Sequence, residues 1–125
     1  MPTIKLYISM TIDGAAPIGF PMTFEQTVDE AMQLLPVEKA SDGNDTSFTA
    51  ATIGDVDAVN FLFLRAVDRA LGIRVEGGEA TNVAIRLDAG GFILIGKATA
   101  LTDTNITVNN NSGAVAKLSG IAGGT

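Results

Sequence analysis

The chain has 125 residues, about the size of one domain, and contains no cysteine and no histidine. It therefore cannot form disulfides, zinc sites built on cysteine or histidine, or the Ser-His-Asp and Cys-His catalytic systems. Eight basic against fourteen acidic residues give a net charge of −6, and the arginines are interspersed with apolar residues, so we expect no nucleic-acid binding.

Charged residues are scarce in this sequence. They make up 18% of the chain, against about 25% in a typical soluble domain, whereas 46% of the residues are hydrophobic. A domain this small has a large surface for its volume and needs polar residues to cover it. We therefore expect part of the surface to be covered by other protein, the alternative being a secreted or thermally robust sandwich.

The N-terminal segment alternates between apolar and polar residues over 3–12, which predicts a half-buried strand. Asp13 and Gly14 form a turn signal, and a shorter strand over 19–24, interrupted by Pro21, is expected at a sheet edge. The segment has no continuous apolar block, so we expect no signal peptide and synthesis in the cytoplasm. No apolar run is long enough to span a membrane.

The middle of the chain contains two ambiguous segments. Residues 27–35 fit one short helix ended by Pro36, but also a strand over 32–35, and residues 39–46 read as a loop. A strand is expected over 48–53. Residues 59–75 fit either one helix or two strands, and a similar layout of apolar and β-branched segments further along favours strands over 60–65 and 71–75.

The rest of the chain is β in character. Strands are expected over 82–87, 92–95, 105–109 and 114–118, with turns between them. This spacing predicts an all-β fold, an antiparallel β-sandwich or jelly roll, in one domain over 1–125 with a glycine-rich tail at 119–125. The expected core residues are Ile4, Leu6, Ile8, Phe61, Phe63, Phe92, Ile106 and Val108.

The uncharged tail must be held by sheet pairing or by a subunit contact if it is ordered. Its candidate assembly contacts are Ile121, Gly123, Gly124 and Thr125.

Only carboxylates remain for chemistry. Asp42 and Asp45 lie in a loop with several oxygen ligands and are weak calcium candidates, although the loop lacks EF-hand spacing and a solvated turn explains it better. A hydrolase could use Asp42, Asp45, Asp55 and Asp57, which lie within sixteen residues. A glycosidase usually also has aromatics that stack on the sugar, and the chain has one Tyr and six Phe, of which three are expected in the core. We therefore expect no catalytic residue, no cofactor and no enzyme activity.

Several β segments, at 59–65, 90–96, 104–109 and 114–118, resemble the small structural proteins of tailed bacteriophages. The resemblance is one of composition: few charges, abundant Thr, Asn, Gly and Ala, and no catalytic residues. It implies a β-sandwich virion protein, either a capsid decoration or cement protein or a minor head or tail component.

The implied partners are further copies of the chain, as a dimer or trimer, and other virion proteins such as the major capsid protein, with the virion as its location. Many weak contacts on a repetitive lattice would add by avidity. The alternative is a β-sandwich module that binds carbohydrate or a host surface through exposed aromatics, with Tyr7, Phe20 and Phe48 as candidates.

Overall fold

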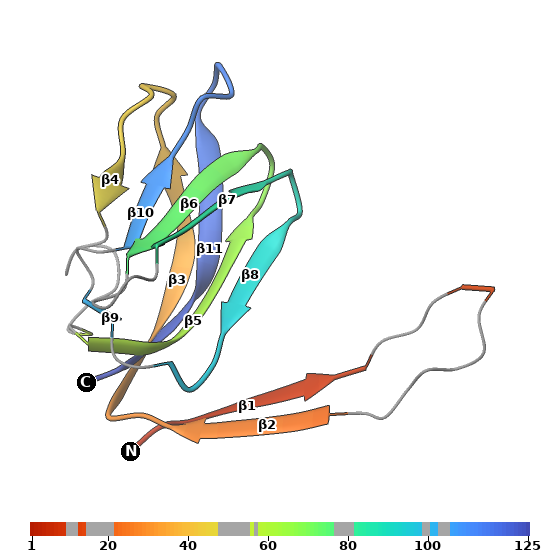
Figure 1. Ribbon diagram of the computed structural model, residues 1–125, viewed down its shortest axis with the longest axis vertical. Coiled ribbons are helices and arrows are strands. Elements are labelled where there is room, and N and C mark those ends of the chain that lie inside the picture. The colour runs from red at the N-terminus through yellow and green to blue at the C-terminus, as the bar shows by residue number, and fades with distance from the viewer. Residues whose placement is uncertain are drawn as a thin grey trace.

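The chain folds into a β-sandwich with a projecting β-hairpin (Figure 1). The computed structural model describes residues 1–9, 13–14, 22–47, 56, 58–76, 82–98, 101–102 and 106–125. Its strands are β1 (Thr3–Ile8), β2 (Met22–Thr27), β3 (Glu30–Lys39), β4 (Thr46–Ser47), β5 (Ala58–Ala66), β6 (Leu71–Glu76), β7 (Asn82–Leu87), β8 (Phe92–Ile95), β9 (Leu101–Thr102), β10 (Ile106–Asn109) and β11 (Ala116–Gly124). These described residues include no helix, and hence none that could span a membrane.

Two antiparallel sheets enclose the core. The large sheet has the order β3-β11-β5-β8, with β9 also paired to β5, and the small sheet has the order β4-β10-β6-β7. One side of each sheet supplies the core residues, in line with the period of two expected for a strand. The core consists of buried apolar side chains, among them Leu62, Leu64, Leu71, Ile73, Ile106 and Leu118. The predicted all-β sandwich is therefore confirmed.

The two ambiguous segments are strands. Residues 59–75 form β5 and β6, joined by a short connection at 67–70, as the strand interpretation required. The segment at 27–35 contributes the end of β2 and half of β3, so the helical alternative is wrong. The expected strand over 48–53 lies outside the described residues.

The C-terminal strand is longer than predicted. The strand expected to end at residue 118 continues as β11 to Gly124, and it lies between β3 and β5 in the large sheet. Backbone hydrogen bonds of 3.1 and 3.2 Å in both directions between Thr125 and Ala58 fix the end of the chain. The glycine-rich tail is thus held by sheet pairing, one of the two ways expected for it, and the predicted end of the last strand at residue 118 is too early.

The expected core residues divide into three groups. Phe61, Ile106 and Val108 are buried as expected, and Phe63 and the three apolar residues of β1 (Ile4, Leu6 and Ile8) are half-buried. Phe92 is 61% exposed, so its assignment to the core is wrong. The cause is that β8 alternates between an exposed and a half-buried face, and Phe92 lies on the face turned away from the core.

Candidate functional site

The candidate site is the face of the large sheet that points away from the core, which we call the outer face. A β-hairpin packs on part of it, and apolar side chains are exposed on the rest. Three rows of side chains cross it: a first row (Gly123, Phe61, Gly96), a middle row (Ile121, Phe63, Leu94) and a third row (Ser119, Arg65, Phe92). The registers of β11 with β5 and of β5 with β8 align these residues, and continuing the second register by one residue places Gly96 beside Phe61.

The first row is covered by the hairpin of β1 and β2, which we call the arm. The Phe24 ring of the arm packs on the Phe61 ring, with centroids 6.0 Å apart, and Phe61 is fully buried. The two glycines of the row make room for this contact. A Cβ at Gly96 would lie 2.8 Å from the Phe24 ring, and one at Gly123 would lie 2.7 Å from the end of Ile4.

A buried amide also fastens the arm to the sandwich. Gln26, 9% exposed, donates from Nε2 to Oδ1 of Asn60 at 2.9 Å, and its Oε1 accepts the backbone N–H of Lys97 at 2.8 Å. The Lys97 ammonium lies 5.7 Å above the Phe24 ring. Because a buried amide must satisfy both of its ends, these bonds fix the arm in one register on the outer face.

These contacts give the direction of the arm. Ile4 lies at Gly123 of β11, whereas Phe24, one row further along the arm, lies at Phe61 of β5 and at Gly96 just after β8. The arm therefore runs across the sheet from β11 towards β8 and continues past it, as Figure 1 shows.

The next pair along the arm is only partly covered. Ile8 and Met22 face each other across the arm, on the same side as Phe24; Ile8 is half-buried and Met22 is 47% exposed. The opposite side of the arm is polar: Lys5 and Glu25 lie 3.7 Å apart there, beside the exposed Tyr7. A two-stranded hairpin whose apolar side is only partly covered is marginal on its own in water.

The middle row and Phe92 form an apolar area that the arm does not cover, while Ser119 and Arg65 make the rest of the third row polar. Leu94 is 38% and Phe92 61% exposed, and the Phe92 ring lies 5.8 Å from that of Phe63. Ile121 and Phe63 are half-buried beside them. Among the described strands β8 pairs only with β5, so its other edge is open, and its sequence Phe-Ile-Leu-Ile has no charge or proline to protect that edge.

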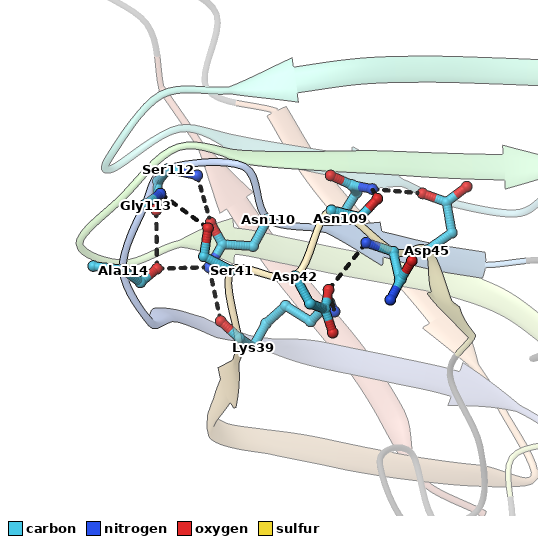
Figure 2. A network of polar contacts seen from close by, with 11 residues as sticks. Lys39, Ser41, Asp42, Asp45, Asn109, Asn110, Ser112, Gly113 and Ala114 are labelled. Carbon is cyan, nitrogen blue, oxygen red and sulfur yellow. Dashed lines mark hydrogen bonds and ion pairs between the residues drawn. The ribbon is translucent and has the colours of Figure 1, made fainter.

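The loop that carries the calcium candidates has another role (Figure 2). Asp42 accepts a hydrogen bond of 2.8 Å from the ammonium of Lys39, whose side chain is 9% exposed, and another of 3.0 Å from the Asn44 backbone. These bonds, that from Lys39 above all, lower the pKa of Asp42 below its ordinary value. Asp42 is thus the counter-ion of a buried lysine.

Asp45 is similarly engaged. Its two oxygens accept hydrogen bonds from Asn109 at 3.0 Å and from Arg74 at 3.4 Å. In the described part of the chain, no three carboxylates gather where they could hold a metal ion. The structure therefore does not support the calcium interpretation; Asp55 and Asp57, the other half of the predicted carboxylate group, lie outside the described residues.

Asn110 organises the turns at this end of the sandwich (Figure 2). It is fully buried, donates from Nδ2 to the carbonyls of Lys39 and Ala114 at 2.8 Å each, and accepts the backbone N–H of Ser112 at 2.9 Å. All three bonds go to the backbone of its own chain, so the residue is structural.

A shallow groove of about 380 Å³ lies on the small sheet. Its lining includes Asp45, Arg74, Arg86 and Asn109, and none of the described residues that line it is aromatic. Sugar sites usually provide an aromatic ring for stacking, so the groove does not favour the carbohydrate alternative. Of the aromatics proposed for that function, Tyr7 is 77% exposed on the arm, and Phe20 and Phe48 lie outside the described residues.

The predicted contact residues of the chain end are mostly used within the fold. Gly123 is buried under the arm, Gly124 is buried against Ala58, and Thr125, although exposed, is paired through its backbone. Assigning Gly123 and Gly124 to a subunit contact is therefore wrong. Ile121 alone of the four lies in an uncovered row.

Sequence reasoning missed the residues that place the arm, namely Phe24, Gln26 and Gly96. The sequence did contain a signal for the arm. Met22, Phe24 and Gln26 alternate with other residues after an Asp-Gly turn signal, and in the structure they lie opposite Ile8, Leu6 and Ile4.

The chain matches no known family model, no curated protein and no solved structure.

Proposed function

We propose that this protein is a non-enzymatic structural subunit of a tailed-bacteriophage virion, either a capsid decoration or cement component or a minor head or tail component. It works by binding copies of itself and a repetitive protein surface. The observation that carries the proposal is the arm, which presents a partly exposed apolar pair, Ile8 and Met22, next to an edge of β8 that no described strand covers and to the exposed Leu94 and Phe92 (Figure 1).

The exposed apolar side chains support this proposal. Met22, Phe92 and Leu94 are 47%, 61% and 38% exposed on the side of the molecule that the arm crosses. A subunit built to be covered by neighbours accounts for these side chains and for the low content of charge.

The virion assignment draws on the phage-like composition of the β segments and on the lack of catalytic groups in the sequence. A phage lattice offers identical sites in many copies, so a small subunit with a weak individual contact can still be retained.

The test is to look for the protein on particles. Antibodies raised against the purified chain are applied to phage particles isolated from the host that carries the gene, and the particles are analysed by mass spectrometry. We expect the chain as a multi-copy component and antibody labelling at regular positions. Particles that contain their other structural proteins but not this chain would refute the virion assignment.

A further inference from the structure

The arm, the open edge of β8 and the exposed apolar rows belong to one side of the molecule. Met22 of the arm, Leu94 of the middle row and Phe92 of the third row are the large apolar residues exposed there. The arm crosses the outer face towards β8 and passes beyond it. Its partly exposed pair, Ile8 and Met22, therefore lies where a continuation of the large sheet would lie.

We infer that a second copy of this chain pairs its β8 with the β8 of the first, antiparallel and centred on Leu94, and that each arm covers Phe92 of the other copy. This inference rests on the proposed function, since it names the self-contact of the assembling subunit. The large sheets of the two copies would join into one, with a twofold axis perpendicular to it.

The register explains why the pairing is self-complementary. An antiparallel pair centred on Leu94 places Phe92 of one copy opposite Gly96 of the other. Gly96 is the position at which the arm crosses its own sheet, under Phe24. The continuation of each arm therefore runs directly over Phe92 of the other copy.

The distances agree with this arrangement. Paired strands are about 4.8 Å apart, and one row along a strand, two residues, is about 6.6 Å. Ile8 and Met22 lie one row beyond Leu6 and Phe24, so they reach just past the position of the neighbour's β8. The two arms would cross at Gly96 and at Phe92, about 13 Å apart along β8, and each arm is only about 10 Å wide.

Several contacts would be completed by this pairing. The open N–H and C=O groups of β8 would gain partners, and four consecutive apolar residues would no longer form an unprotected edge. The partner's Ile8 and Met22 would cover Phe92, and the middle row would be enclosed between the two arms. A second copy of the chain therefore provides all three features that complete these contacts: a β8 edge, an arm and an apolar surface.

Because the chain has no native cysteine, a single introduced cysteine tests the axis directly. Leu94→Cys would lie next to its own copy, within the Cα separation that a disulfide accepts. We expect most of this variant to form a disulfide-linked dimer under mild oxidation. Ile85→Cys is the control, since Ile85 is 41% exposed at the edge of the small sheet and should remain unlinked at the same protein concentration.

A second measurement compares the dimerisation of variants substituted on the apolar side of the arm, on β8 and on the polar side of the arm. Light scattering should give a concentration-dependent mass that rises towards 25.8 kDa, twice the 12.9 kDa of one chain. Met22→Glu and Leu94→Glu should each weaken dimerisation at least tenfold, whereas Tyr7→Glu, on the polar side of the arm, should change it less than twofold. Circular dichroism should show all variants folded, because the substituted positions are exposed in the monomer.

Two results would overturn the inference. One is a dimer that is unaffected by both glutamate substitutions, and the other is a strict monomer in which Leu94→Cys crosslinks no faster than Ile85→Cys. Antibody labelling of particles gives a separate result, so a chain that is present on particles but lacks this dimer refutes the inference while the proposed function stands.

Discussion

Substitution of the buried Phe61 tests whether the arm packs on the first row of the outer face. Phe61→Ala removes a fully buried ring that lies between the sheet and Phe24 of the arm. Truncation of a buried phenylalanine costs about 3–5 kcal/mol. We expect the free energy of unfolding to fall by that amount, because the truncation leaves a space between the sheet and the arm that the arm would have to shift to fill.

Phe92→Ala is the matched control, since it is the same truncation on the same face of the same sheet. Phe92 is 61% exposed, so about two fifths of its surface is buried in the monomer. Scaling the cost of a buried ring by that fraction gives about 1–2 kcal/mol. The two variants should therefore differ two- to threefold in the free energy of unfolding.

The assay is urea unfolding followed by circular dichroism, with both truncations made in the Leu94→Glu background so that self-association does not contribute. Hydrogen exchange should also show faster exchange of the β1 and β2 amides in Phe61→Ala than in Phe92→Ala. Equal losses of stability, or unchanged exchange in the arm, would refute the packing of the arm on the first row.

Three further predictions concern the fold. Gln26→Leu leaves the two groups that its amide bridges without partners, and should cost about 1–3 kcal/mol in urea unfolding. Gly120→Ala would place a Cβ within van der Waals overlap of a backbone carbonyl, and should cost at least about 2 kcal/mol, whereas Gly72→Ala, with its nearest atom at 3.7 Å, should be nearly neutral. The pKa of Asp42 is lowered, so the bond to Lys39 stabilises the fold above about pH 4 and is lost as the pH falls through the folded-state pKa. Asp42→Asn should accordingly lower the urea midpoint at pH 7 and flatten its decline between pH 5 and pH 2.

Local patterns were sufficient to predict most strands. The choice of two strands over a helix at 59–75 was correct because a polar connection separates two apolar segments, each of strand length. The half-buried strand at the N-terminus also followed from its period of two. Such features depend on neighbours in sequence, which a single chain displays directly.

The extension of the C-terminal strand beyond residue 118 was missed because its cause is non-local. Residues 119–124 are small and glycine-rich, a composition that argues against a strand when it is read alone. In the fold, β11 is held between β3 and β5, and Gly120 and Gly124 approach the carbonyls of Phe63 and Ala58 too closely for any side chain. Glycine is thus required at positions where the sequence pattern had predicted that the last strand was already over.

The position of Phe92 was missed for a different reason. In the run Phe-Ile-Leu-Ile every residue is apolar, so the sequence shows no alternation that would distinguish the core side from the outer side. Whether an outer position is covered then depends on where the arm lies. Phe61 is covered by the arm and Phe92 is not, although both rings belong to the same face.

Charge is unevenly placed on the outer face. Among the nine positions that β11, β5 and β8 contribute to the three rows, Arg65 is the one that carries a charge, whereas Lys117 and Glu38 are paired on the same face just beyond the third row. The small sheet has Arg74, Arg86 and Asp45 around its groove. The self-contact that we infer uses the three rows and not the small sheet. It therefore predicts that charge added to the rows weakens association while the same charge on the small sheet does not.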